Sequence, residues 1–294
     1  MAGWDGFKAG LRKMPGFGVL RFMVHLARGG DARGLALLRL RPRDNLFQPY
    51  PNTWPDRYPD LFRAVRERVG DGDGRRILSF GCSTGEEVFT LRRHFARAAI
   101  TGLDINPYNI ALCRARALWR RQAMLDFRVA GSAERECDAS YDAIFAMAVF
   151  RHGDLNLSPP PQRCDHRLRF ADFETTVADL SRCLKPGGVL VLAHCHFRLG
   201  DTASAGNFAS LQRWDSGLAQ PLYGRDNRLL AKAAGDEGIF IKIECPSPVD
   251  GSRLAYESGV DRFRSTHFGI SPASGGGATA TAPAGPGPSV RRWR

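Results

Sequence analysis

Apolar residues in the middle of the chain occur as short runs that alternate with stretches of helical spacing. The run at 141–149 is almost continuously apolar, as expected for a strand buried on both faces of a parallel sheet. The alternation of strands and helices predicts an α/β fold with a doubly wound, mostly parallel sheet. The expected strands are 77–80, 99–103, 127–130, 141–149, 189–193 and 238–243, and the expected helices are 85–97, 106–121 and 170–184.

Local signals mark the ends of several of these elements. Asn106 followed by Pro107 predicts an N-cap and a first helical residue. The Pro-Gly-Gly sequence at 186–188 predicts a turn into the next strand. Asp226-Asn227-Arg228 predicts the start of a further helix.

The ends of the chain do not share this pattern. Residues 1–58 form a basic extension, with an amphipathic stretch at 18–28 and a proline- and aromatic-rich loop at 48–59. The domain itself is expected over 59–245. Residues 246–294 form a C-terminal extension, which its Gly, Ala, Pro and Ser content predicts to be disordered from about residue 271.

The formal net charge is +12, but the arginines are spread along the whole chain, so no specific nucleic-acid partner is expected. The stretch at 18–28 is compatible with peripheral membrane contact. Seven cysteines without a C-x-x-C pair argue against a disulfide framework and favour a cytoplasmic protein.

The loop Gly81-Cys82-Ser83-Thr84-Gly85 follows the first predicted strand, at the sheet edge where open α/β proteins bind ligands. It lacks the middle glycine of a dinucleotide loop and the Gly-Lys-Ser/Thr of a Walker loop. Glu86 and Glu87 follow at once and would repel a phosphate. S-adenosylmethionine, which carries an ammonium and a sulfonium but no phosphate, fits better. Asp104 ends the second strand, where a carboxylate can accept hydrogen bonds from ribose hydroxyls.

Five segments in the same order resemble the motifs of class I S-adenosylmethionine-dependent methyltransferases. They are ILSFGCSTGEEVFTLR at 77–92, GLDIN at 102–106, GSAE at 131–134, YDAIFAMAVFRH at 141–152 and LKPGGVLVL at 184–192. The GCSTGEE sequence is especially similar to chemotaxis receptor methyltransferases and to many small-molecule methyltransferases. The adenine segment departs from the commoner acidic pattern.

The resemblance implies a set of cofactor-binding residues. Gly81, Cys82, Ser83 and Gly85 would line the methionine side, and Glu86 would meet its ammonium. Asp104 and Ile105 would hold the ribose and flank the adenine, which Ser132 and Ala133 would touch. Ala146 and Met147 would lie beneath the methionine.

Catalysis by such an enzyme consists mainly of holding a nucleophile in line with the methyl group, with a base where the nucleophile carries a proton. His152 follows the fourth strand and is the candidate base. Three irregular segments, 48–59, 153–169 and the stretch after His196, are expected to converge on the acceptor. Tyr50, Trp54, Arg57 and His196 are the candidate acceptor-binding residues.

His194-Cys195-His196 ends the fifth strand, and strand alternation would place both histidines on one face. The spacing matches no recognised metal signature, so no metal site is predicted. We expect the histidines to line the substrate pocket.

Three functions remain open at this point. The first is methyl transfer to a small-molecule or glycan acceptor. The second is protein carboxyl methylation of the chemotaxis type, although that family carries an Asn-containing motif where this chain has Ala148-Val149-Phe150. The third is a membrane-surface or nucleic-acid-binding module that keeps a methyltransferase fold without catalysis.

Overall fold

The computed structural model describes residues 23, 30, 33, 34, 38, 46–48, 53–215, 220–231 and 233–243. The chain divides into two units, Met1–Ser247 and Pro248–Arg294, and every described residue belongs to the first. The predicted disordered tail and most of the amphipathic stretch therefore lie outside the described residues. Among the described helices, none is long and apolar enough to cross a membrane.

Seven strands form one sheet in the order β3-β2-β1-β4-β5-β7-β6. The first five strands pair in parallel, and β7 runs antiparallel to both of its neighbours. This arrangement confirms the predicted doubly wound, mostly parallel sheet. The strands are β1 (Arg76–Phe80), β2 (Ala99–Asp104), β3 (Leu125–Val129), β4 (Tyr141–Met147), β5 (Leu184–Ala193), β6 (Phe208–Arg213) and β7 (Gly238–Lys242).

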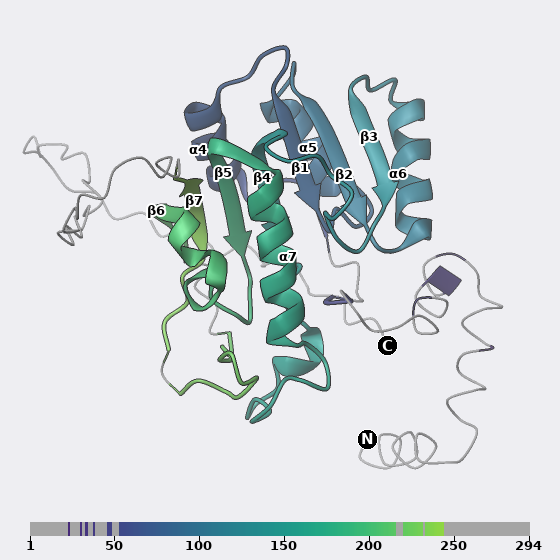
Figure 1. The fold of residues 1–294 in the computed structure, drawn as a ribbon. Helices are drawn as coiled ribbons and strands as arrows, with labels where there is room; N and C mark the ends of the chain where they lie inside the picture. The colour runs from purple at the N-terminus through teal and green to yellow at the C-terminus, as the bar shows by residue number, and fades with distance from the viewer. Residues whose placement is uncertain are drawn as a thin grey trace, which may run out of the picture. The chain divides into compact units, whose positions relative to one another are not determined.

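Helices cover both faces of the sheet. On one face, α4 (Pro59–Val69), α5 (Glu86–His94) and α6 (Pro107–Trp119) pack their buried apolar side chains into one core cluster. On the other face, α7 (Phe170–Cys183) packs Phe170, Phe173, Val177 and Leu180 into a second cluster. Figure 1 shows α7 in front of the sheet and α5 behind it. Short 3₁₀ turns at Gly153–Leu155, Leu199–Asp201 and Ala203–Asn207 complete the described elements.

Local capping decides where α6 begins. The side-chain oxygen of Asn106 accepts a hydrogen bond from the Tyr108 N–H at 3.0 Å, and the helix starts at Pro107. This confirms the predicted cap.

The helix predicted to start at 226–228 is wrong. Isolated β-bridges pair Tyr223 with Leu229 and Arg163 with Arg228, and Asn227 has a φ of 61°. The segment is a turn, because Asn227 tolerates the left-handed conformation that closes it.

The parallel strands end together at the lower edge of the sheet in Figure 1, and the predicted site loops leave from there. The loop after β1 lies between the ends of β2 and β4, because β1 pairs with both strands. The chain after β4 and the chain after β5 also leave at this edge. The fold therefore gathers the motif segments at the carboxyl ends of the strands.

Candidate active site

The loop after β1 turns tightly against the end of β4. The N–H groups of Gly81 and Cys82 both donate to the Leu103 carbonyl at 2.8 Å. Gly81 has a φ of 75°, and a Cβ at this position would lie 2.3 Å from Cγ2 of Val149. Gly85 caps α5 in the left-handed conformation. Glycine is therefore required at Gly81 for conformation and for space, which keeps the loop backbone close to the sheet edge.

Asp104, at the end of β2, ties this loop to α6. Its carboxylate accepts the Ser83 N–H at 2.8 Å, the Asn106 N–H at 2.8 Å and the side-chain amide of Asn109 at 3.1 Å. The residue is 8% exposed. Asp104, the residue predicted to bind the ribose, therefore also holds the β1 loop and the start of α6 together, and no local sequence pattern indicates this second role.

Two oxygen atoms beside this carboxylate are buried without a partner among the described residues. They are Ser83 Oγ and Asn109 Oδ1. Buried polar atoms are almost always hydrogen-bonded. Two unpaired oxygens on residues that both bind the Asp104 carboxylate therefore indicate that a polar ligand binds here. Ribose hydroxyls can donate to both oxygens and can also accept from the Ser83 hydroxyl, so these residues fit the predicted cofactor.

The two glutamates at the start of α5 have different surroundings. Glu86 forms a salt bridge with Arg116 of α6 at 2.7 Å, so its carboxylate is already paired within the protein. Glu87 accepts a hydrogen bond from Ser79 Oγ of β1 at 2.7 Å. Burial raises the pKa of Glu87 to about 8, against the opposing effects of Ser79 and Arg57. Glu87 is a candidate site residue that the sequence analysis did not select.

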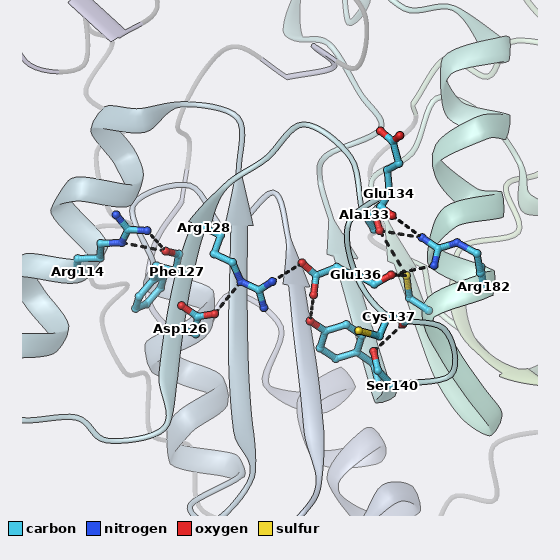
Figure 2. A network of polar contacts seen from close by, with 12 residues as sticks. Arg114, Asp126, Phe127, Arg128, Ala133, Glu134, Glu136, Cys137, Ser140 and Arg182 are labelled. Carbon is cyan, nitrogen blue, oxygen red and sulfur yellow. Dashed lines mark hydrogen bonds and ion pairs between the residues drawn. The ribbon is translucent and has the colours of Figure 1, made fainter.

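The segment after β3, predicted to meet the adenine, is held by a polar network. The Arg182 guanidinium of α7 donates to the carbonyls of Ala133, Glu134 and Glu136. Figure 2 shows this network, in which the Glu136 carboxylate also pairs with Arg128. Ala133 is fully buried, whereas Ser132 and Ile105 are partly exposed. The network therefore fixes the backbone on which these predicted residues lie.

The end of β4 forms the floor of the same region. Ala146 is fully buried and Met147 is 6% exposed. The chain then leaves the strand at Ala148, whose φ is 59° and whose N–H donates to the Ala193 carbonyl at 2.7 Å. Val149 contacts the Gly81 loop from this side.

The candidate base, His152, is 7% exposed. Its Nδ1 accepts the Asp154 N–H at 3.1 Å, which caps the 3₁₀ turn that follows. Burial lowers the pKa of His152, against the opposing effect of Asp154. His152 lies at the predicted edge of the sheet, and its Nδ1 is used by the local backbone. Its base role stays a prediction.

The prediction that His194 and His196 share one face is wrong. β5 ends at Ala193, and His194 has a φ of 54°, so strand alternation does not extend through this segment. His194 packs against Tyr58 and Trp214, at ring centroid distances of 5.7 and 5.1 Å. His196 instead packs against Tyr223 at 6.1 Å.

His196 does not offer an exposed ring to a substrate, because it is fully buried. Its Nδ1 lies 2.9 Å from the Pro221 carbonyl and its Nε2 lies 3.3 Å from the His152 carbonyl. Burial lowers the pKa of His196 to about 4. These contacts join the loop after β4 to the segment around 221, which is a structural role.

The other predicted acceptor residues are only partly placed. Tyr50 lies outside the described residues. Trp54 is 54% exposed, and the Arg57 guanidinium lies over its ring at 4.2 Å. Arg57 also lies over the Tyr58 ring at 5.0 Å. Trp54 and Arg57 are therefore together, as the sequence analysis expected, and Tyr58 joins them.

A hollow of about 340 Å³ lies at the opposite, amino edge of the sheet, beside Arg75, Asp142 and Lys185. Arg75 and Lys185 both pair with Asp142, at 2.7 and 2.9 Å, and the Arg76 N–H also donates to it. The polar groups there satisfy one another, so this hollow is not the candidate site.

A model of a protein family described as a methyltransferase domain matches residues 78–192. This range begins in β1 and ends in β5, and it contains the loop at 81–85 and Asp104. This match supports, over residues 78–192, the resemblance to class I S-adenosylmethionine-dependent methyltransferases that the five motifs carry. The sheet order places the methyltransferase loops at one edge, as the resemblance of the five motifs implied.

Two characterised proteins are similar to this chain. An O-methyltransferase of Aspergillus nomiae is 26% identical over 135 residues, which cover 45% of this chain and 52% of that protein. A fatty-acid O-methyltransferase of Mycolicibacterium smegmatis is 27% identical over 195 residues, which cover 65% of this chain and 56% of that protein. The chain thus spans about half the length of the curated relatives it matches.

Solved structures similar to the chain include the [4+2]-cyclase SpnF, at 29% identity and a TM-score of 0.33, covering 45% of this chain and 43% of that one. They also include a geranyl diphosphate C-methyltransferase from Streptomyces coelicolor, at 16% identity and a TM-score of 0.35, covering 46% of each chain.

Proposed function

We propose that this protein transfers a methyl group from S-adenosylmethionine to a small organic acceptor. The observation that carries the proposal is a pair of buried oxygens beside the Asp104 carboxylate, Ser83 Oγ and Asn109 Oδ1, for which the described part of the chain supplies no partner. The methyltransferase-domain match over the same segment supports it. The names of both curated relatives, which are O-methyltransferases, support a small-molecule acceptor.

The cofactor-binding residues divide into two groups along the sheet edge. On the adenosine side, Asp104, Ser83 and Asn109 would hold the ribose, with Ile105, Ser132 and Ala133 around the adenine. On the methionine side, the backbone of the Gly81–Gly85 loop would lie above Ala146 and Met147. When bound, the cofactor supplies an activated methyl group, and the protein needs only to bind and orient the acceptor.

The ammonium of the cofactor requires a carboxylate on the methionine side. Glu86 was predicted for this role, but its carboxylate is paired with Arg116. We assign the role to Glu87, which lies against Ser79 at the end of β1. An ammonium ion beside Glu87 would lower its pKa from the raised value and ionise it, because an opposite charge favours the charged form. Glu87→Gln should therefore weaken S-adenosylmethionine binding more than Glu86→Gln does.

A labelling experiment tests the proposed activity. The protein is incubated with methyl-labelled S-adenosylmethionine and an extract separated into small-molecule and protein fractions. We expect label in the small-molecule fraction with wild type, and less label, at a cofactor concentration below saturation, with an Asp104→Asn variant that is shown to be folded. Label found only in protein would support protein methylation instead. No transfer to any fraction by a protein that binds the cofactor would contradict the proposal.

A further inference from the structure

Six side chains form a cluster beyond the ends of β4 and β5, which we call the arginine–aromatic cluster. Three of its rings pack together, with centroids 5.6 Å apart for Tyr58 and Trp214, 5.7 Å for Tyr58 and His194, and 5.1 Å for His194 and Trp214. Gln220 Nε2 donates to His194 Nδ1 at 2.9 Å. The members are Arg57, Tyr58, Arg151, His194, Trp214 and Gln220.

Three polar atoms of this cluster are buried and have no hydrogen-bond partner among the described residues. They are Tyr58 Oη, Arg151 Nε and Gln220 Oε1. Tyr58 is only 6% exposed. Tyr58 Oη and Arg151 Nε are donors, whereas Gln220 Oε1 is an acceptor. A buried donor without a partner costs free energy, so the two unpaired donors, which come from separate segments, indicate a missing polar ligand. The tyrosine stays a donor, because burial raises its pKa.

The charge of the cluster indicates the sign of that ligand. Arg57 and Arg151 both lie near His194, and with burial they lower its pKa to about 4, so the imidazole is neutral. Of the nearby carboxyl groups, Glu87 accepts from Ser79 and is assigned to the ammonium of the cofactor, which balances its charge. Glu237 already accepts the N–H groups of His194 and Cys195, at 2.8 and 2.7 Å. Two guanidinium groups thus lie close to Tyr58 and His194, and their positive charge would favour an anion there.

The cluster is adjacent to the methionine side of the proposed cofactor site. Arg151 lies two residues after Val149, which contacts Gly81 of the cofactor loop. Asp104, which marks the ribose side, ends β2, and β1 separates β2 from β4. The cluster is therefore displaced from the ribose toward β4 and β5.

We propose that the arginine–aromatic cluster binds the carboxylate of an organic acid acceptor, and that a carboxylate oxygen is the atom methylated. This inference rests on the proposed methyltransferase function. A guanidinium group and a phenol can donate together to one carboxylate, and the guanidinium adds a charge-assisted bond. The ring stack of Tyr58, His194 and Trp214 would pack against the apolar body of the acid.

The reaction balances without a proton acceptor. A lone pair on the carboxylate oxygen forms the new bond to the methyl carbon, while the sulfur–methyl bond breaks and leaves its electron pair on sulfur. The positive sulfonium and the negative carboxylate give a neutral thioether and a neutral methyl ester. Carboxylic acids with a pKa of about 4 are ionised at neutral pH, so no base is needed. His152, whose Nδ1 caps a turn, is then dispensable for the chemistry.

The same cluster has another potential ligand, the carboxylate of the cofactor's own methionine moiety. Two cofactor products separate these sources. S-adenosylhomocysteine carries that carboxylate, whereas methylthioadenosine lacks it. If the cluster served the cofactor, Arg151→Gln would weaken S-adenosylhomocysteine but not methylthioadenosine.

The test measures acid binding to protein saturated with S-adenosylhomocysteine. The probes are hexanoate, dodecanoate, benzoate and phenylacetate, each with its amide as a neutral match. The variants are Arg151→Gln and Tyr58→Phe. The control is Arg63→Gln, an exposed arginine of α4 paired with Asp60. Tyr58→Phe should fold normally, because the deleted hydroxyl has no partner among the described residues.

We expect wild type to bind at least one acid and not its amide, and to form its methyl ester with S-adenosylmethionine. Both variants should bind that acid about tenfold or more weakly, since each loses a hydrogen bond to a charged group. Their affinity for S-adenosylhomocysteine should stay within about threefold of wild type, and Arg63→Gln should match wild type throughout.

Three results would overturn the inference. The first is equal binding of acid and amide, and the second is no binding of any of the four acids. The third is a loss of S-adenosylhomocysteine affinity, but not methylthioadenosine affinity, in Arg151→Gln. Wild-type protein that fails to bind S-adenosylhomocysteine at all would instead contradict the proposed function itself, so the two failures are distinguishable.

Discussion

Replacing Asp104 with alanine should weaken the fold as well as the cofactor site. The carboxylate accepts three hydrogen bonds, at 2.8, 2.8 and 3.1 Å, from the β1 loop, the α6 cap and Asn109. A hydrogen bond to a charged group contributes about 1.5–3 kcal/mol. Because the three bonds share one carboxylate, their contributions are not additive. We expect Asp104→Ala to lower the free energy of unfolding by about 3–5 kcal/mol.

This loss is large against a typical total stability of about 5–15 kcal/mol. Urea denaturation followed by tryptophan fluorescence measures it, and the slope of the transition checks that both proteins unfold in the same way. Asp104→Asn should cost less, about 1–3 kcal/mol, because one oxygen remains while the new amide opposes the Ser83 N–H. The control is Asp126→Asn, an exposed carboxylate paired with Arg128, which should change stability by less than about 0.5 kcal/mol.

Cofactor binding is measured separately, at urea concentrations below the unfolding transition of each variant. S-adenosylhomocysteine should bind Asp104→Asn about tenfold or more weakly than wild type, since a ribose hydroxyl loses a charged acceptor. A free energy of unfolding for Asp104→Ala within about 0.5 kcal/mol of wild type would refute the structural role, since leaving three donors without an acceptor should destabilise the fold by more than this.

Three other predictions follow from single residues. Gly81→Ala should destabilise the protein by about 1–3 kcal/mol, because the position has a φ of 75° and the new methyl group would overlap Val149. Thermal unfolding should show partial recovery of this stability when Val149→Ala is added. Unchanged stability of the single variant would contradict the geometry. Burial raises the pKa of Glu87 from 4.5 to about 8, so between these pH values the folded state binds a proton that the unfolded state has lost, and stability should fall as pH rises. Glu87→Gln should flatten this part of the plot of stability against pH. A plot parallel to that of wild type would show that the carboxyl is not buried. Arg182→Gln should weaken the binding of S-adenosylhomocysteine and of methylthioadenosine by the same factor, about three- to tenfold, because it removes the hydrogen bonds that hold the backbone of the adenine segment. Unequal losses of affinity in titrations with the two compounds would show that the segment does not bind the adenine.

The sequence predicts the parallel part of the sheet well, because buried strands and capped helices are encoded by neighbouring residues. The strand at 141–149 and the Asn106 cap are both local patterns, and both are confirmed to within two residues. β6 (Phe208–Arg213) was not predicted, since its exposed and partly exposed residues show no apolar alternation. It forms because β7 offers an unpaired edge, which is a property of the assembled sheet.

The residues of the candidate site also differ in whether local sequence patterns predict them. The loop at 81–85 and Asp104 are visible in the sequence because they directly follow apolar strands. The choice between Glu86 and Glu87 is not visible, because adjacent helix residues point about 100° apart and only the position of Arg116 decides which one is paired. Tyr58, Arg151 and His194 meet only when separate segments reach one sheet edge, so no spacing in the sequence could have joined them.

Titration of the purified protein with S-adenosylhomocysteine tests the central claim most directly. Calorimetry should show saturable binding at one site, with no binding of NAD or ATP, because the loop at 81–85 lacks the glycine and lysine pattern of a phosphate-binding loop. Asn109→Ala should weaken the binding, since Asn109 Oδ1 is one of the two oxygens beside Asp104 that have no partner among the described residues. Binding of NAD or ATP without any binding of S-adenosylhomocysteine would contradict the assignment.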